Sequence, residues 1–559
     1  MFSHLTALDN HAATHADAPA FKLPQMSTHG GSSQSVEAWI PVSYRRFRDD
    51  VEHFAKYWIT TFQRAGIAPR SCIGIWIDGM TYQDVLHVFG VSRAGYIPQL
   101  LHFHRSSSKS LVVELLRHAN SLALICDVSH AQLNHDSSSS FASLPIPVYA
   151  NSDLRQARVP GHCTLSKVED LVADPNAVAF VLHTTGTTLG TPKLVPYTHR
   201  TVDLIMRRAQ VIAAPTPSRR QDTYAMNLSI CHYRGLVSFF GSLIHAACIA
   251  QPTRRDFCSV ELGDMIQRAG VNKLHTTATQ ISVHIRDFRH NPNILHGVRG
   301  LEDITHHAPL NREDEEWLVQ NRIPFSCTYG TTEVPLILRS ARDSRTPSST
   351  FMQLIDSRSV TFVPISSSGS SSSTLPSSVY KNVNTNVLEL VIPATSPDCP
   401  HPSVRQSEDG HFHTGDLFLE VVPGHYTFRG RMCEWIRSST GLWYDAKMIE
   451  ENVLKSCPDL LVECIAVGNG RPSPVVLIEL GPGAATFGGA DSVKREVYRR
   501  IRHFQSRRLA HERIGSVESF VIVQRSAWPR TSVGHIRRTD AEQKFQRELD
   551  RVYAAASAR

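Results

Sequence analysis

Short apolar runs alternate with amphipathic stretches along most of the chain. Residues 72–77 (CIGIWI) and 122–128 (LALICDV) are short, aliphatic and β-branched, which is typical of buried strands. Residues 81–95, which lie between them, carry apolar side chains at helical spacing. This alternation predicts an α/β fold, with a buried and largely parallel sheet covered by helices.

The chain of 559 residues is longer than one hydrophobic core usually organises, so two or more domains are expected. We predict a large N-terminal domain of several layered subdomains over residues 1–430 and a small, mobile α+β domain over residues 431–559. Two serine-rich stretches, 135–143 and 366–378, are predicted to be flexible surface loops, because strand-like pattern resumes after each.

Composition narrows the class of protein. Apolar residues make up 41% and charged residues 19%, as in globular proteins, and the net charge of +7 comes from scattered Lys and Arg, so no nucleic-acid partner is expected. No apolar run approaches the ~20 residues of a membrane helix, and the N-terminus lacks the pattern of a signal peptide. Because no such run occurs, no membrane partner is expected. The 11 cysteines are spread singly, so we expect a cytoplasmic protein with reduced thiols.

A threonine- and glycine-rich turn follows the apolar run 177–182. The stretch 183–199 reads HTTGTTLGTPKLVPYTH, and its hydroxyls and backbone N–H groups could surround phosphate oxygens. The spacing of Gly186, Gly190 and Lys193 does not satisfy a Walker A motif. Taken alone, the turn is either a surface loop or a phosphate site.

Further motifs decide between these readings. TTGTTLGTPK resembles the phosphate loop of adenylate-forming enzymes, the superfamily of acyl-CoA synthetases, luciferases and peptide-synthetase adenylation domains. HHAPL (306–310), YGTTE (329–333), HTGDL (413–417), GRMCEWI (430–436) and PRTSVGHIRR (529–538) resemble that superfamily's later motifs, in the same order. The resemblance covers almost the whole chain.

A narrower resemblance lies in residues 89–107 and 466–480. They are similar to adenylation domains of fungal NRPS-like enzymes of the carboxylic acid reductase type. In those enzymes a carrier domain and a reductase domain follow, whereas 21 residues follow Arg538 here. We therefore expect a free-standing adenylation unit or a shortened gene product.

The resemblance implies roles for particular residues. The phosphate loop would hold ATP phosphates, Tyr329 would stack on adenine, and Asp416 and Arg431 would bind the ribose. Glu333 would bind Mg²⁺, with Thr332 near the α-phosphate. The predicted nucleotide-binding set is Thr184, Thr185, Gly186, Thr187, Thr188, Lys193, His307, Ala308, Tyr329, Thr332, Asp416 and Arg431. For each of these, the alternative is a turn residue or a surface charge.

The acyl pocket is expected along residues 226–240, with His232 and Gly235 at the superfamily's Phe-His-x-x-Gly position. Relatives that activate α-amino acids place an aspartate there to pair the ammonium. No Asp or Glu occurs between Tyr224 and Phe240, and a buried ammonium without a partner is costly. An aryl, aliphatic or keto acid is therefore expected as the substrate. His232 is expected to line the pocket, and a core histidine is the alternative.

The chain departs from the superfamily pattern at several positions. Leu189 lengthens the phosphate loop, His306 and His307 replace two glycines, and Cys433 stands at the hinge, where a polar or charged residue is usual. The catalytic lysine of the closing motif is replaced by His535, whose reference pKa of about 6.5 leaves it mostly neutral at pH 7. Catalysis is therefore expected to be impaired, unless imidazolium at His535, or Arg537 or Arg538, supplies the missing charge.

The resemblance implies ATP-dependent activation of a small carboxylic acid as an acyl-adenylate, with Mg²⁺. The acyl group would then pass to a phosphopantetheine thiol on a separate carrier protein or polyketide synthase, in fungal secondary metabolism. The alternatives are an acyl-CoA ligase, with CoA as the acceptor, and a degenerate, non-catalytic protein that binds a nucleotide or a partner.

Overall fold

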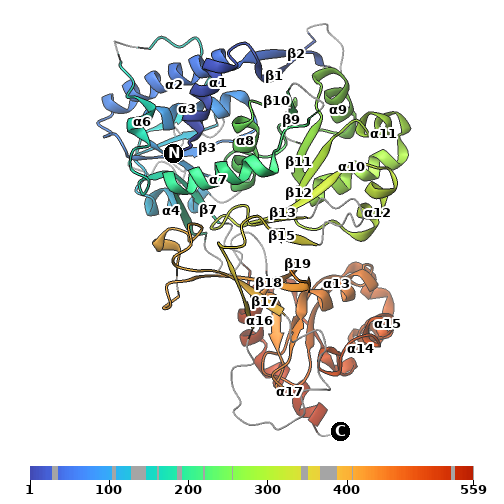
Figure 1. The fold of residues 1–559 in the computed structure, drawn as a ribbon. Coiled ribbons are helices and arrows are strands. Elements are labelled where there is room, and N and C mark those ends of the chain that lie inside the picture. Colours follow the sequence, from blue (N-terminus) through green and yellow to red (C-terminus); the bar gives the residue numbers. More distant parts are fainter. Residues whose placement is uncertain are drawn as a thin grey trace.

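The computed structural model describes residues 1–27, 36–103, 109–127, 146–159, 163–184, 192–217, 221–254, 256–340, 351–365, 387–405, 407–530 and 536–557. The predicted site residues Thr185, Gly186, Thr187, Thr188 and His535 lie outside the described residues, as do both serine-rich stretches. Figure 1 shows two large lobes above a smaller C-terminal part.

One lobe is built on a sheet that has six strands within the described part of the chain. Its first five strands are parallel and the last pair is antiparallel, in the order β6 (Val148–Ala150), β5 (Ala123–Cys126), β3 (Cys72–Trp76), β4 (Ile97–Leu100), β7 (Val178–His183), β8 (Leu194–Thr198). Its helices are α1 (His4–Thr14), α2 (Tyr44–Arg64), α3 (Tyr82–Arg93), α4 (Lys109–His118), α6 (Val168–Leu171) and α7 (His199–Ile212). The predicted strands at 72–77 and 122–128 and the helix at 81–95 are confirmed.

A thirteen-stranded sheet, counted over the described residues, forms the second lobe and continues beyond it. Its parallel middle comprises β1 (Pro19–Met26), β10 (Cys248–Ala250), β9 (Thr223–Ala225), β11 (Lys273–Thr277), β12 (Asp303–His307) and β13 (Phe325–Tyr329). Around it lie α8 (Tyr233–Ile244), α9 (Ser259–Asp264), the π-helix η2 (Met265–Ala269), α10 (Ala278–His290), α11 (Pro292–Val298) and α12 (Arg312–Gln320).

Both ends of this long sheet are antiparallel. β2 (Val36–Ser43) closes one end, and the other is formed by β14 (Leu338–Ser340), β15 (Met352–Leu354), β19 (His425–Arg431), β18 (Phe412–Val422), β17 (Val387–Ile392) and β16 (Thr361–Pro364). The prediction of a largely parallel sheet is therefore wrong for the region after Tyr329. Among the described residues, β18 and β19 are joined by the two-residue turn 423–424, and such a short connection can only join antiparallel strands.

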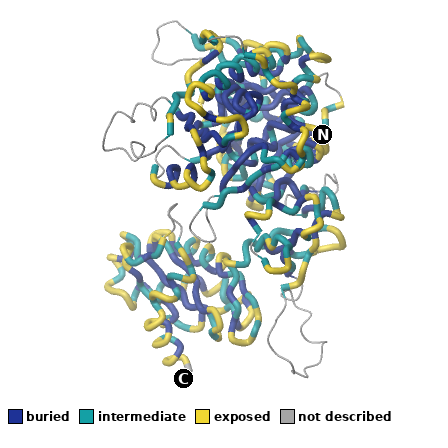
Figure 2. Tube along the Cα trace, turned by 90° about the vertical axis from the view of Figure 1, so that its left-hand side faces the viewer, coloured by how far each residue is buried: buried dark blue, intermediate teal, exposed yellow. Residues whose placement is uncertain are grey.

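The largest apolar core gathers side chains of α1, α2, α3, α7 and α8 with strands of both sheets, and Trp58, Phe54 and Phe240 are almost fully buried in it. Figure 2 shows the buried residues gathered in the interior of the upper part, with exposed residues around them. Burial of large aromatic side chains contributes roughly 2–3 kcal/mol each, so this core ties the six-stranded sheet to the longer one.

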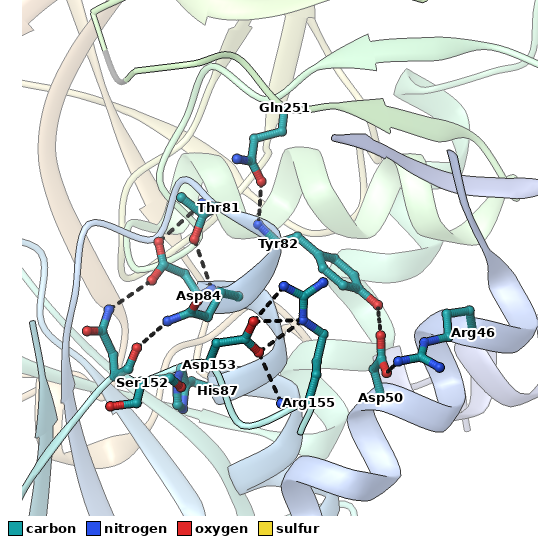
Figure 3. Close-up of polar contacts among 12 residues, drawn as sticks. Arg46, Asp50, Thr81, Tyr82, Asp84, His87, Ser152, Asp153, Arg155 and Gln251 are labelled. Carbon is teal, nitrogen blue, oxygen red and sulfur yellow. Dashed lines mark hydrogen bonds and ion pairs between the residues drawn. The ribbon is translucent and has the colours of Figure 1, made fainter. Parts of the chain in front are cut away.

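A buried polar network fixes the start of α3 (Figure 3). Thr81 and Asp84 form a capping box, and the Asp84 carboxylate also accepts the Met80 N–H at 3.0 Å. Tyr82 donates its hydroxyl to Asp50 at 2.9 Å, and Arg46 pairs with the same carboxylate at 2.9 Å. These bonds pair polar groups that would be costly to bury alone, and they hold α3 against α2.

The C-terminal part has cores of its own. Its strands β22 (Leu461–Val467), β23 (Val475–Leu480) and β24 (Phe520–Ile522) form one sheet, and β20 (Trp435–Arg437) pairs with β21 (Trp443–Asp445). Its helices are α13 (Ala446–Ser456), α14 (Ala490–Arg500), α15 (Arg502–Gln505), α16 (Arg538–Lys544) and α17 (Gln546–Ser557). The buried side chains of its two apolar clusters all come from residue 436 onward.

The predicted fold class, a large layered α/β N-terminal part with a smaller α+β part after it, is confirmed. The boundary at residue 430 and the mobility of the small domain stay predictions. In the described part of the chain, every helix is too short or too polar to cross a membrane.

Candidate active site

Three side chains from distant motifs meet at the carboxyl end of β13. Tyr329, the last residue of β13, donates its hydroxyl to Asp416 Oδ2, and Arg431 Nε lies 2.9 Å from Asp416 Oδ1. Asp416 lies on β18 and Arg431 ends β19, and these two residues are register partners across the antiparallel pair. The sheet therefore joins the YGTTE, HTGDL and GRMCEWI motifs.

Asp416 has one acceptor that the described chain does not satisfy. Its side chain is 2% exposed, and burial raises the pKa of Asp416 above its usual range, while Arg431 and Tyr329 offset part of that rise. The contact from Arg431 is an ion pair without hydrogen-bond geometry, so Asp416 Oδ1 has no hydrogen-bond donor among the described residues. A buried carboxylate oxygen without a donor fits an incoming hydroxyl group.

A cavity of about 200 Å³ opens beside these residues, and we call it the large cavity. The residues that matter for its chemistry are Arg234, Ala308, Tyr329, Gly330, Asp416 and Arg431. Tyr329 packs edge-on against Phe418 at 5.0 Å between ring centroids, so its ring forms part of an aromatic wall. The large cavity is therefore lined by charged side chains on one part of its wall and by aromatic rings on another.

The turn after β13 is held close to the cavity. A Cβ on Gly330 would lie 2.3 Å from Leu336 N, so only glycine fits there. Tyr233 donates its hydroxyl to Gly330 O, and Tyr197 donates its hydroxyl to Thr332 O at 2.7 Å. Glu333 follows, and its charge raises the pKa of both Asp416 and Arg431, which places its carboxylate in their electrostatic neighbourhood.

The β7–β8 hairpin carries the predicted phosphate loop. Thr184 N donates to Lys193 O at 2.9 Å, and Lys193 N donates to Thr184 Oγ1 at 3.1 Å. These two bonds close the base of the loop at its two described ends. The structure thus places Thr184 and Lys193 opposite each other.

The start of α8 supplies the predicted acyl-pocket residues. His232 is the N-cap, and its Nδ1 accepts from Arg234 N at 3.2 Å. A Cβ on Gly235 would lie 1.9 Å from Ser229 O, so glycine lets the helix approach that loop. Burial lowers the pKa of His232 well below its usual value, so its ring is neutral at pH 7.

His306 and His307 lie inside β12 instead of facing the large cavity. His306 Nδ1 contacts Ala308 O at 2.9 Å, and His307 Nδ1 contacts Thr328 Oγ1 at 2.8 Å. Burial lowers the pKa of His306 to about 4 and also lowers that of His307. Ala308, whose φ is 70°, turns the backbone toward the large cavity in their place.

The segment between the two parts of the chain is short and internally bonded. Cys433 lies in the 3-10 turn η5 (Met432–Glu434), and it is exposed there. Glu434 accepts from Arg431 N at 2.9 Å and pairs with Lys447 at 3.2 Å, so it bridges β19 and α13.

The candidates for replacing the missing lysine differ in how they are held. Arg530 and Ile536 form a bridge on either side of residues 531–535. Arg538 pairs with Glu450 at 2.6 Å and is mostly buried, whereas Arg537 pairs with Asp540 at 2.8 Å and is 44% exposed. Arg538 is therefore a structural cation, and Arg537 is the freer of the two.

Sequence reasoning missed two residues of this region. Glu389 accepts from Gly415 N at 3.1 Å and contacts His413 at 3.0 Å, so it shapes the turn that presents Asp416. The sequence signal that could have identified Glu389 is that it is the one charged residue in the apolar run 387–392. Arg234 lines the large cavity and is the one charged residue between Tyr224 and Phe240.

Comparisons with known proteins give the family. The family model described as AMP-binding enzyme matches residues 8–355, and the one described as AMP-binding enzyme C-terminal domain matches residues 434–557. The AMP-binding domain-containing enzyme iboA of Amanita muscaria (strain Koide BX008) is 31% identical over 537 residues, covering 95% of this chain and 98% of that protein.

Solved structures share the fold. The o-succinylbenzoate CoA synthetase MenE of Bacillus subtilis, in complex with its acyl-adenylate intermediate, aligns with a TM-score of 0.67 at 16% identity, over 95% of this chain and 97% of that one. ATP-bound MatB from Rhodopseudomonas palustris aligns with a TM-score of 0.67 at 14% identity, over 97% of this chain and 99% of that one. The chain therefore belongs to the AMP-binding enzyme family, and it is an adenylate-forming, acyl-activating ligase.

Proposed function

We propose that this enzyme uses ATP and Mg²⁺ to activate a small carboxylic acid without an α-amino group, and then transfers the acyl group to a thiol. The observation that carries the proposal is the Asp416 carboxylate, buried beside Tyr329 and Arg431 at the floor of the large cavity, with Oδ1 lacking a donor. Such an oxygen suits ribose hydroxyls, since an ionised carboxylate accepts strong hydrogen bonds.

The other proposed nucleotide contacts are assigned from where each residue lies relative to the large cavity and the predicted phosphate loop. Tyr329 and the backbone of Ala308 face the large cavity, where they border the adenine. Thr184 and Lys193 close the loop that holds the β- and γ-phosphates. Glu333 would hold Mg²⁺, which typically takes one or two carboxylates together with phosphate oxygens and would neutralise charge that develops on them.

The proposed reaction proceeds in two steps. A carboxylate oxygen of the acid attacks the α-phosphorus, and pyrophosphate leaves. A thiolate then attacks the acyl carbon, the C–O bond breaks, and AMP leaves with the original carboxylate oxygen. Thr332 lies beside the α-phosphate in the first step. A cation from the C-terminal part, His535 in its protonated form or Arg537, bridges the acid and the α-phosphate.

The class of carboxylic acid that we propose is based on the residues of the predicted acyl pocket. No Asp or Glu stands between Tyr224 and Phe240, so an α-ammonium group would be buried without a counter-charge. His232 supplies a neutral ring at the start of α8. These features favour aryl, aliphatic or keto acids over amino acids.

The thiol in our proposal is phosphopantetheine on a separate carrier protein or polyketide synthase, in fungal secondary metabolism. The similarity to iboA of Amanita muscaria supports the fungal setting. The second candidate is CoA, because the structural neighbour MenE is named a CoA synthetase.

Two assays test the proposal. ATP–pyrophosphate exchange across a panel of aryl, aliphatic, keto and amino acids should respond to at least one acid outside the amino-acid group. With that acid, mass spectrometry should find the acyl group on a phosphopantetheinylated carrier rather than on CoA. A product on CoA alone would reassign the acceptor. Saturable ATP binding without exchange for any acid would favour the non-catalytic alternative.

A further inference from the structure

Two small cavities lie between the long sheet and the helices α7 and α8. We call the first the inner cavity, and its volume is about 20 Å³. The strands contribute His275, Thr305, His307 and Thr328 to its lining, and residues of α7 and α8 complete it. His275 pairs with Thr305, and His307 pairs with Thr328, in the register of the parallel strands. These four side chains therefore share one face of the sheet, which is the face that α8 covers.

The inner cavity borders the nucleotide site. Thr328 lines both the inner cavity and the large cavity. In the proposed reaction the carboxylate of the acid attacks the α-phosphorus, so the remainder of the acid extends away from the nucleotide. The inner cavity is the space into which we extend it, because it adjoins the large cavity on the side of α8.

The second space, which we call the end cavity, continues from the inner cavity and has a volume of about 30 Å³. His275 and Ser238 line both of them. Apart from His275 and Ile249, the lining of the end cavity comes from residues 224–242. This range contains the predicted acyl pocket, 226–240, so the two small cavities lie where the sequence places the acid.

The size of the two small cavities limits what can enter them. A cavity of about 150 Å³ takes up a benzene ring, whereas a single water fits in roughly 10–15 Å³. The volumes of about 20 and about 30 Å³ are therefore enough for one or two small groups each. A hydroxyl, carbonyl or methyl group fits, and an aromatic ring does not.

The lining of the two small cavities carries no charge. Neither includes an Asp, Glu, Lys or Arg residue. Burial lowers the pKa of His275 to about 3 and lowers that of His307 well below its usual value, so both rings are neutral at pH 7. An ammonium group or a second carboxylate would be buried there without a counter-charge, which is costly.

Two buried ring nitrogens beside the inner cavity lack partners. His275 Nδ1 and His307 Nε2 have no hydrogen-bond partner among the described residues, while His307 Nδ1 contacts Thr328 Oγ1 at 2.8 Å. Leaving a buried polar atom unpaired is unfavourable, so an oxygen that enters beside these rings gains by pairing with them. A carbonyl oxygen accepts from a ring N–H, and a hydroxyl serves either tautomer of the ring.

We infer that the substrate is a small hydroxy or oxo acid, whose uncharged oxygen lies in the inner cavity and is hydrogen-bonded by His275 and His307. This inference rests on the proposed function and narrows its aryl, aliphatic and keto acids to those with a small, neutral oxygen-bearing group. A site that pairs such an oxygen rejects an analogue without it, since that analogue leaves the buried ring nitrogens unpaired.

Acids of equal length that differ in one group test this inference. Butyrate is the reference, and it is compared with 3-hydroxybutyrate, 4-hydroxybutyrate and 2-oxobutyrate. Succinate and 4-aminobutyrate add a charge, and benzoate adds a ring. Three-carbon and five-carbon hydroxy and oxo acids are compared with propionate and pentanoate in the same way. Pyrophosphate exchange is measured with varied acid and with varied ATP, and acid binding is measured by calorimetry with a non-cleavable ATP analogue.

The wild type should prefer at least one hydroxy or oxo acid to its unsubstituted parent by about 10- to 100-fold in kcat/KM, which is the effect of leaving a buried polar group unpaired. Succinate, 4-aminobutyrate and benzoate should be poor substrates. Exchange that is fastest with an unsubstituted, charged or aromatic acid would overturn the inference.

Matched variants assign the preference to the two rings. His275→Leu and His307→Leu should lose most of it with an unchanged KM for ATP, and His275→Gln should retain part of it. The control is His284→Leu on α10, because His284 is buried and bonded to Ser259 at 2.8 Å but lines neither small cavity. A preference that survives in both His275→Leu and His307→Leu, or that is lost equally in His284→Leu, would contradict the inference.

Calorimetry separates this inference from the proposed function. If no acid supports exchange but a hydroxy or oxo acid binds, and His275→Leu abolishes that binding, the inference stands and the proposed function fails. If butyrate exchanges as fast as its hydroxy and oxo derivatives, the proposed function stands and the inference is wrong. Absence of binding of every hydroxy and oxo acid to the wild type would also overturn the inference.

Discussion

At the scale of single residues, the nucleotide site depends on one carboxylate. Asp416 receives the Tyr329 hydroxyl on one oxygen and the Arg431 charge on the other, and it is almost fully buried. Burial alone would favour the protonated acid, and Arg431 favours the ionised form. The balance leaves a hydrogen-bond acceptor that is already oriented before the nucleotide arrives.

Replacing Asp416 with Asn should lower kcat/KM for ATP by about 10- to 100-fold, because one or two charge-assisted bonds to ribose are weakened. Tyr329→Phe should have a smaller effect, since it removes only the donor that orients the carboxylate. Steady-state kinetics with varied ATP measures both. Glu316→Gln on α12, which is 54% exposed, is the control. ATP kinetics of Asp416→Asn equal to this control would remove Asp416 from the site.

His535 is the residue whose role rests on sequence alone. A histidine with a reference pKa of about 6.5 gains its charge as the pH falls from 8 to 6, so exchange activity should rise over that range. His535→Lys should raise the rate at pH 8 and flatten the profile, and His535→Ala should lower the rate. Equal profiles for the wild type and His535→Ala would make Arg537 the next residue to test, because Arg538 is engaged by Glu450.

At the scale of elements, the motifs were predictable and their surroundings were not. The strands at 72–77 and 122–128 follow from short apolar runs, since period and length identify a buried strand. The antiparallel pairing of the strands after Tyr329 did not follow, because a short apolar run predicts a strand without showing whether it pairs parallel or antiparallel with its neighbour. The burial of His306 and His307 was likewise hidden, since a sequence does not show which side of a strand faces a cavity.

The start of α8 provides a test at this scale. Gly235→Ala should lower the free energy of unfolding by about 1–3 kcal/mol, because its Cβ would overlap Ser229 O. Gly263→Ala in α9 is the matched control, since its Cβ would lie 3.7 Å from Ile294 and alanine favours a helix by up to about 1 kcal/mol. Urea unfolding followed by circular dichroism compares them. Equal midpoints would contradict the close approach of α8.

At the scale of the whole molecule, several histidines are buried in neutral form. Burial lowers the pKa of five of them to values between about 3 and about 4: His4, His87, His183, His275 and His306. Between these values and the unfolded value of 6.5, the unfolded chain binds protons that the folded chain does not. Stability contributed by these groups is therefore present above pH 6.5 and is lost as the pH falls toward 4.

The expected loss is up to about 1.4 kcal/mol per pH unit for each such group. Urea unfolding at a series of pH values should show it, with a shallower slope in His87→Gln, which removes one titrating ring outside the candidate site. His425→Gln is the control, because His425 is at the surface. A stability that stays constant from pH 6.5 to pH 5 would contradict the buried neutral state.

The central claim is that this chain joins a carboxylate to the α-phosphate of ATP. The most direct measurement uses an acid labelled with ¹⁸O in its carboxylate. The enzyme turns this acid over, and mass spectrometry then identifies the nucleotide that is released when the thiol attacks the acyl group. The account predicts AMP that carries one ¹⁸O atom, with pyrophosphate as the other product. Unlabelled AMP, or ADP with phosphate, would contradict it.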